Sequence, residues 1–252
     1  MKQDRIGIVM AMQEEIRPIL RRLGSYRKER LAGFPVYRFQ MKERQISLIE
    51  SGMGTKKAKA ATDALVSHDK PRLLISAGFS GAVREGLVVG DLVIAEQSLS
   101  LDNGVTSNVA VFENESLLRT LTASCADQPF RIARGTTVTT RGIVAKRSAD
   151  QLLSKEVANP VLDMETSVVA ETAAAKGIPL VIVRAISDAA GEELLFSLDE
   201  ITDRELNIRI GKVLLAIAKN PRILPQMLRL AKYATLAGNN LAVVMERLVP
   251  LV

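Results

Sequence analysis

Short apolar runs alternate with helix-like segments along most of the chain, and no other feature of the sequence constrains its fold as strongly. Several runs are apolar almost throughout, as expected of strands that are covered on both faces of a sheet. This alternation predicts an α/β protein. The predicted strands span residues 5–11, 36–41, 45–51, 72–78, 90–97 and 179–187, and the predicted helices span residues 14–23, 56–68, 116–124, 165–177 and 204–220.

The composition limits the class of protein. The chain has 252 residues, 47% of them apolar, and shows neither repeats nor a linker, so we expect a single domain over residues 1–252. The lone cysteine, Cys125, excludes an intramolecular disulfide, and the lone histidine, His68, excludes a multi-histidine metal site. We expect no signal peptide, because residues 1–10 lack its basic and apolar regions, and no run is long enough to span a bilayer. We therefore expect a cytoplasmic protein that uses neither metal nor cofactor.

The net charge of +6 resides mainly in residues 205–252, which carry seven basic and two acidic side chains. This segment is predicted to be a basic amphipathic helical extension that packs on the domain or on a partner subunit. Peripheral contact with a membrane surface through Arg229, Lys232 and Arg247 is the alternative. Nucleic acid is not an expected partner, because the segment contains a single aromatic residue and no recognisable binding module. The apolar stripe consists of Met227, Leu230, Ala234, Leu241, Val244 and Leu248.

Chemically suggestive residues follow four of the predicted strands. They are Glu15, the glycine-containing segments SGMG (51–54) and AGFSGA (77–82), and the pair Ser187 and Asp188. In α/β sheets, ligands bind beyond the carboxyl ends of the strands, so residues distant in sequence meet there. Each signal is weak alone, since glycines after strands form ordinary turns and acids stabilise helix starts. Their joint occurrence predicts a ligand site.

The residue types in this set suit acid–base chemistry. Asp188 ends an apolar strand and is a candidate to retain a proton for a leaving group, whereas Glu15 is a candidate to activate water. The backbone amides of Ser80 and Gly81 are placed to meet a substrate. SGMG is not a phosphate-binding P-loop, because the spacing of that motif is absent.

The stretch VLDMETSVVA (161–170) adds two further carboxylates, because Asp163 and Glu165 flank Met164 where an apolar run turns into a helix. Alone, the stretch has the composition of an ordinary acidic helix N-terminus. Beside the four strand ends, it indicates a functional site.

The order and approximate spacing of these motifs resemble the nucleoside phosphorylase/nucleosidase superfamily, and within it the methylthioadenosine/S-adenosylhomocysteine nucleosidases. The resemblance covers about residues 5 to 203 and rests on IGIVMAMQEEI, SGMG, AGFSGA followed by GLVVGDLVIAE, DMET and VRAISD. It implies a three-layer αβα fold around a mixed, partly closed sheet, a homodimer, and cleavage of the N-glycosidic bond of a purine nucleoside.

The resemblance also implies roles for individual residues. Asp188 would protonate N7 of the purine, with Ser187 hydrogen-bonded beside it. Glu15 would polarise the attacking water, and Arg184 would lie near that water and hold the acids in place.

The sugar and the base would be bound by a second group of residues. Glu165 would bind the ribose hydroxyls, where a carboxylate stabilises the positive charge of an oxocarbenium-like sugar. Met164 would pack against the sugar, with Asp163 behind it. Ile143 and Val144 would wall the base pocket.

The chain departs from the family pattern at three places. Phe79 stands where the family has a small residue, which predicts a reshaped sugar or nucleophile site. Ile143 stands where the base normally stacks on an aromatic ring, and Arg141 where the family often has an acid. The basic C-terminal extension is the third departure.

These departures keep several alternatives open. DMET and the extension are similar to the hopanoid-associated phosphorylases, which release adenine from a lipid-linked adenosyl group, and futalosine hydrolase is a third relative. A phosphorylase needs donors for phosphate, and Arg84 is the nearest arginine after the AGFSGA segment. Glu15 would repel phosphate, which favours water. A non-catalytic nucleoside-binding protein is the remaining alternative, against which the retained acid and base argue.

Overall fold

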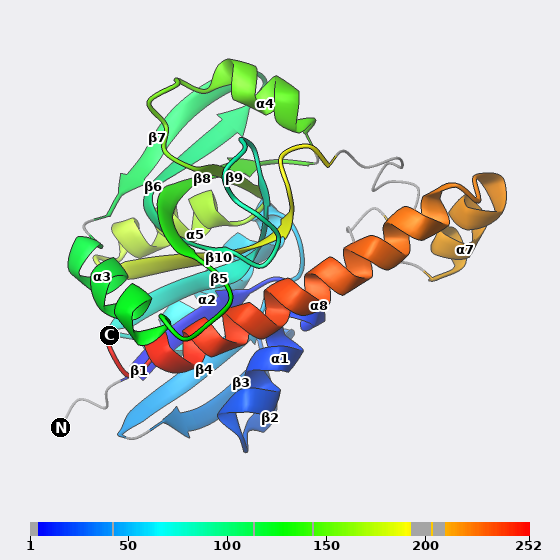
Figure 1. Ribbon diagram of the computed structural model, residues 1–252. Coiled ribbons are helices and arrows are strands. Elements are labelled where there is room, and N and C mark those ends of the chain that lie inside the picture. Colours follow the sequence, from blue (N-terminus) through cyan, green and yellow to red (C-terminus); the bar gives the residue numbers. More distant parts are fainter. Residues whose placement is uncertain (1–4, 42, 113, 143, 193–202, 204–209) are drawn as a thin grey trace.

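The computed structural model describes residues 5–41, 43–112, 114–142, 144–192, 203 and 210–252, and its helices cover both faces of one sheet (Figure 1). The strands are β1 (Arg5–Met10), β2 (Arg27–Leu31), β3 (Phe34–Met41), β4 (Arg44–Glu50), β5 (Leu73–Ala82), β6 (Leu92–Asp102), β7 (Val105–Val111), β8 (Ile132–Thr140), β9 (Pro160–Asp163) and β10 (Leu180–Asp188). The helices are α1 (Gln13–Leu23), α2 (Thr55–Asp69), α3 (Glu115–Ser124), α4 (Lys146–Leu152), α5 (Thr166–Ala175), α7 (Ile210–Lys219) and α8 (Ile223–Leu248).

The sheet is mixed and partly closed, as predicted. Its strands follow the order β10-β6-β8-β9-β5-β1-β4-β3-β2, with β7 paired to β6. An additional pairing of β10 with β5 closes β5, β9, β8, β6 and β10 into a ring. The long strand β5 belongs to both parts, because it pairs with β1 near its start, with β9 at its end, and with β10 along most of its length. This ring and the open sheet together give the barrel-like centre of the fold.

All six predicted strands and the helices α1, α2, α3 and α5 are confirmed, whereas part of the predicted helix 204–220 lies outside the described residues. The segment AGFSGA is not a turn after a strand but the second half of β5. The segment TVTTRGIVAK (137–146), which contains Arg141 and Val144, begins inside β8 and ends at the start of α4. Four strands escaped prediction: β2 is polar, β7 is largely exposed, β9 has four residues, and β8 is rich in threonine.

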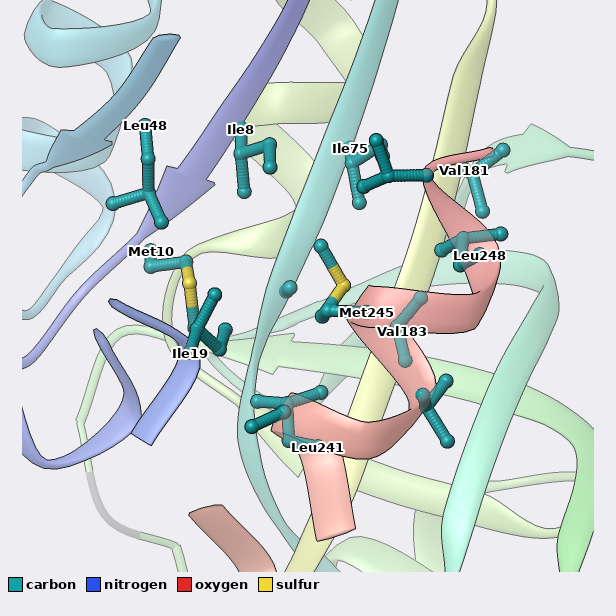
Figure 2. Close-up of a cluster of buried hydrophobic side chains, with 14 of the residues drawn as sticks. Ile8, Met10, Ile19, Leu48, Ile75, Val181, Val183, Leu241, Met245 and Leu248 are labelled. Atoms are coloured by element: carbon teal, nitrogen blue, oxygen red, sulfur yellow. The ribbon is translucent and has the colours of Figure 1, made fainter. Parts of the chain in front are cut away.

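Two hydrophobic layers hold the helices on the sheet. One lies between the sheet and helices α1 and α8, and the other lies beneath α2 and α5. Figure 2 shows the first layer, where residues of α8 meet those of the sheet and of α1. Its labelled members are Ile8, Met10, Ile19, Leu48, Ile75, Val181, Val183, Leu241, Met245 and Leu248.

The C-terminal helix α8 packs on the domain through its second half, as expected for the apolar stripe. Leu241, Val244 and Leu248 are fully buried, whereas Met227, Leu230 and Ala234 in the first half are only partly buried. The first half and α7 extend beyond the sheet (Figure 1). Within the described residues, no helix combines the length and the apolar composition that a bilayer span requires.

Replacing Leu241 by alanine tests the contribution of α8 to the core. Leu241 is 0% exposed, so the change leaves a cavity and lowers the free energy of unfolding by about 2–5 kcal/mol. Leu236→Ala on the same helix is the matched control, because Leu236 is 45% exposed and its loss costs less than about 0.5 kcal/mol. Urea denaturation of both variants measures the difference. Equal stability of the two would contradict the packing described.

Candidate active site

The carboxyl ends of β1, β4, β5 and β10 meet at one edge of the sheet, as the sequence predicted. These strands are neighbours and run parallel to one another. A small cavity of about 10 Å³ lies there, which is close to the space that one water molecule needs. Its lining consists of Val9, Met10, Ala11, Glu15, Ser51, Ser76, Ala77, Gly78, Phe79, Glu165 and Arg184.

Glu15 is held in this cavity by backbone amides. The side chain starts from the first turn of α1, and the residue is 2% exposed. Its Oε2 accepts hydrogen bonds from the backbone N–H groups of Ala11 (3.0 Å) and Met12 (2.9 Å), and its Oε1 accepts one from Phe79 (2.8 Å). Burial raises the pKa of Glu15 above its usual value, although these amides and Arg184 oppose the shift. A buried carboxylate with a raised pKa is a stronger base toward a nearby water.

A buried ion pair lies behind the cavity. Asp163 at the end of β9 contacts Arg184 of β10, with 3.0 Å between Oδ2 and Nε, and both side chains are at most 3% exposed. Burial favours the neutral form of Asp163, but the charge of Arg184 and hydrogen bonds from Thr166 and Thr139 outweigh it and lower the pKa. Arg184 also donates to Ser76 (2.8 Å). The carboxylate of Asp163 is therefore occupied by the protein, and its role is to position its neighbours.

Glu165 is the next carboxylate in this arrangement, and Asp163 fixes its backbone. Oδ1 of Asp163 accepts the N–H groups of Glu165 and Thr166 at 3.2 Å, at the start of α5. The Oε1 of Glu165 in turn accepts the N–H of Gly54 (2.7 Å), which joins the DMET and SGMG motifs. Gly54 has φ of 95°, a conformation that favours glycine. Burial, then the charges of Asp163 and Glu15, raise the pKa of Glu165 to about 8.

Asp188 lies at the end of β10 beside the second half of β5. A bulge at Ser187 shifts the register, so that Ile186 pairs with Ser80 and Asp188 with Gly81. Bulges of this kind re-aim side chains near sites. Ser187 Oγ donates to Oδ1 of Asp188 (2.8 Å), as the resemblance implied. The other oxygen, Oδ2, forms an ion pair with Lys146 of α4, a residue that the sequence analysis missed.

Two glycines on β5 make room for Glu15, the candidate general base, and for Asp188, the candidate acid. A Cβ at Gly78 would lie 2.8 Å from Oε1 of Glu15, and a Cβ at Gly81 would lie 2.5 Å from Oδ2 of Asp188. Contacts under 3.0 Å require something to move, so the side chain of any other residue would displace these carboxylates. Glu15 and Asp188 thus meet β5 three residues apart, on the order of 10 Å along the strand.

The remaining predicted binding residues have different surroundings. The hydroxyl of Ser80 is buried and has no hydrogen-bond partner among the described residues, so it retains a bond for a ligand. Met164 is partly buried. Val144 is partly buried and packs against the cluster of Val83, Val138 and Leu153. Ile143 lies outside the described residues.

Phe79 lines the small cavity and also packs against α8. Its ring lies against α8, where a Cβ at Gly238 would be 3.4 Å from Cζ of Phe79 and 3.1 Å from the carbonyl oxygen of Glu14. The ring is partly buried against the first hydrophobic layer. A reshaped sugar or nucleophile site stays a prediction, because Phe79 also lines the small cavity. The backbone N–H of Phe79 still binds Glu15.

A larger hollow of about 770 Å³ opens beside the small cavity, and the two share Ser51. The SGMG segment, the start of α2, residues of β3 and its preceding turn, and Arg141 line it. Arg141 is paired with Asp102 (2.7 Å). No three His, Cys, Asp or Glu side chains of the described segments are grouped so that they could hold a metal ion.

Arg84, the candidate phosphate ligand, is engaged elsewhere. Its guanidinium pairs with Asp150 of α4 (2.6 Å) and donates to the carbonyl oxygens of Val157 (2.8 Å) and Ser154 (3.0 Å). These contacts tie the end of β5 to the α4–β9 connection. Arg84 therefore acts as a structural tie in this fold.

Replacing Glu165 by glutamine tests its raised pKa. Because the folded pKa of about 8 exceeds the ordinary value of 4.5, the wild-type protein loses stability as the pH rises between these values. We expect Glu165→Gln to unfold at higher urea than wild type at pH 9, by a few kcal/mol at most, with a smaller difference at pH 5. Glu171→Gln, on the exposed face of the same helix, should show no such trend. A pH-independent difference would contradict the assignment.

Comparison with known proteins places this chain in a family. The family model described as the phosphorylase superfamily matches residues 5–219. The 5′-methylthioadenosine/S-adenosylhomocysteine nucleosidase of Haemophilus influenzae strain PittEE is 30% identical over 209 residues, or 78% of this chain and 91% of that protein. The nucleosidase of the same description from Listeria innocua is 26% identical over 211 residues, or 77% of this chain and 91% of that protein.

Solved structures share the fold over the whole chain. A Helicobacter pylori 5′-methylthioadenosine/S-adenosylhomocysteine nucleosidase in complex with a pyrrolidine ligand gives a TM-score of 0.72 at 17% identity, with 100% of both chains covered. The futalosine hydrolase of Helicobacter pylori gives 0.73 at 17% identity, with 99% of both chains covered. With the family model spanning most of its length, this chain belongs to the phosphorylase superfamily.

Proposed function

We propose that this protein is an N-ribosyl hydrolase that cleaves the glycosidic bond of adenine nucleosides such as methylthioadenosine or S-adenosylhomocysteine. The observation that carries the proposal is the water-sized cavity that Glu15 lines together with Arg184 and Glu165. The similarity to nucleosidases over most of the chain supports the substrate class.

Water is the favoured nucleophile over phosphate for three reasons. The cavity has room for about one water molecule. The carboxylate of Glu15 would repel a phosphate anion inside this cavity. Arg84, the arginine that follows the second half of β5, is bound to Asp150 and to backbone carbonyls. Hydrolysis therefore fits the site better than phosphorolysis.

The reaction divides among three carboxyl groups. Asp188 protonates N7 of the base as the bond between C1′ and N9 breaks, and the electron pair of that bond stays on the base. Glu165 binds the ribose hydroxyls and, in its ionised form, stabilises the cationic sugar. Glu15 takes a proton from the water that attacks C1′. The ion pair of Asp163 with Arg184 holds Glu15 and Glu165 in position. Ser80 offers its unpartnered hydroxyl to the substrate.

Product analysis tests the reaction class. Purified protein is incubated with methylthioadenosine or adenosine, with and without phosphate, and the base and sugar products are separated by chromatography. We expect free adenine and an unphosphorylated sugar, independent of phosphate. A sugar 1-phosphate that forms only with phosphate would assign the protein to the phosphorylases instead. If no adenine is released, a lipid-linked adenosyl compound becomes the substrate to test.

Substitutions of the base and the acid distinguish an enzyme from a binding protein. We expect Glu15→Gln and Asp188→Asn to lower kcat by about 10²–10⁴-fold, the usual contribution of general acid–base groups. The Kd for methylthioadenosine, measured by calorimetry, should change little. Glu14→Gln is the matched control for Glu15, because Glu14 is the exposed neighbour in the same turn. Unchanged turnover in both site variants would favour a non-catalytic role.

The assembly that we infer is a homodimer, as the resemblance implies. Leucines of the extending helices supply an exposed apolar surface, on which Leu215, Leu224, Leu228 and Leu236 are 41–58% exposed. Light scattering measures the molar mass of the wild type and of Leu224→Ser/Leu228→Ser. A dimer that the double substitution weakens supports this contact. Binding of a monomer to anionic phospholipid vesicles would favour the membrane surface instead.

A further inference from the structure

Lys146 is the one buried lysine in the part of the chain that the structure describes, with 8% of the residue exposed. It is the first residue of α4. Lysine is rarely buried unless its charge is paired. Its ammonium has three donors, and the structure shows three acceptors: Oδ2 of Asp188, the carbonyl oxygen of Asp188 (3.3 Å) and that of Ala189 (2.5 Å). All three acceptors lie at the end of β10 or directly after it.

The surroundings of Asp188 show what this lysine does. The carboxylate has one partner on each oxygen, Ser187 on Oδ1 and Lys146 on Oδ2, and its side chain is 27% exposed. On the facing strand, a Cβ at Gly81 would lie 2.5 Å from Oδ2 of Asp188 and 3.1 Å from Cε of Lys146. Gly81 therefore leaves room for the pair. Among the described residues, Lys146 is the charged group in contact with Asp188.

We propose that Lys146 is the positioning residue of the acid: it orients Asp188 toward the leaving base and offsets the charge that Asp188 acquires when it gives up its proton. This proposal rests on the proposed function. In the step concerned, the proton of the Asp188 carboxyl group moves to N7 of the base, the bond between C1′ and N9 breaks with its electrons on the base, and a carboxylate remains beside the Lys146 ammonium.

Lys146 affects the two states of Asp188, the neutral carboxyl group and the carboxylate, to different extents. The ammonium attracts a carboxylate much more strongly than a neutral carboxyl group, and the attraction is large because Lys146 is buried. A charge that is in place before the reaction, where negative charge develops, lowers the barrier without reorganisation. The two carbonyl contacts fix the ammonium, so the direction of Asp188 is also set.

A comparison of two leaving groups tests this role in Lys146→Met. Adenine leaves from methylthioadenosine only when it is protonated, whereas 4-nitrophenolate leaves from 4-nitrophenyl riboside without a proton. We expect kcat for methylthioadenosine to fall by about 10²-fold or more, and kcat for the nitrophenyl riboside to stay within about threefold.

Matched variants separate this role from a loss of folding. Arg147→Met removes a positive charge from the neighbouring, exposed position of α4 and should leave both substrates unaffected. Lys146→Arg keeps the charge and should recover part of the activity. Lys146→Ala should recover part of it when ethylamine is added, because the free amine occupies the site of the lost side chain.

The outcomes are distinct. Equal losses on both substrates, without rescue by arginine or ethylamine, would overturn the proposal and leave Lys146 a structural residue. Unchanged activity in Lys146→Met would overturn it as well. Wild-type protein that releases no adenine from any adenosyl substrate would overturn the proposed function itself, whereas wild-type turnover with an unaffected Lys146→Met would overturn only the role of the lysine.

Discussion

The buried ion pair of Asp163 and Arg184 is the contact on which the arrangement of the site depends. A pair of this kind is expensive to bury and is stable only when hydrogen bonds satisfy the remaining polar atoms. Here Thr139, Thr166 and Ser76 meet that requirement. The pair joins β9 to β10 across the ring of strands and orients the start of α5. The backbone of Glu165, and through Glu165 the SGMG segment, takes its position from this contact.

Strand β5, like the ion pair, supports several parts of the site at once. Its glycines contact the two groups that the proposed reaction needs at opposite ends of the scissile bond. Gly78 faces Glu15, and Gly81 faces Asp188. Since β5 pairs with strands on both sides, both groups are positioned against the same rigid strand. Lys146 and Ser187 then fix the direction of the acid, and backbone amides fix the direction of the base. The site is thus built from local supports on one shared strand.

Much of this arrangement could be predicted because it is written in local patterns. Apolar runs indicate the parallel strands, and the rule that ligands bind at their carboxyl ends predicts that Glu15 and Asp188 lie at the same edge of the sheet. The threonine-rich strand β8 and the four-residue strand β9 lack such a pattern, since ring closure rather than composition makes them strands.

Contacts between distant segments could not be predicted from one sequence. Lys146 is 42 residues from Asp188, and nothing in the run VAKRSAD marks that lysine as buried. The direction of the Phe79 ring depends on the absence of a side chain at Gly238, which lies far away in the chain. The occupation of Arg84 likewise depends on carbonyl groups of the α4–β9 connection. Such facts follow from the packing of the whole fold.

The packing of α8 also has a consequence for how the protein is made. This helix supplies Leu241, Met245 and Leu248 to the core, and Gly238 lies against both Phe79 and the backbone of Glu14. Yet α8 follows every strand and each proposed catalytic residue along the chain. During synthesis, all the groups for the chemistry are therefore made before the helix that packs beside Glu15.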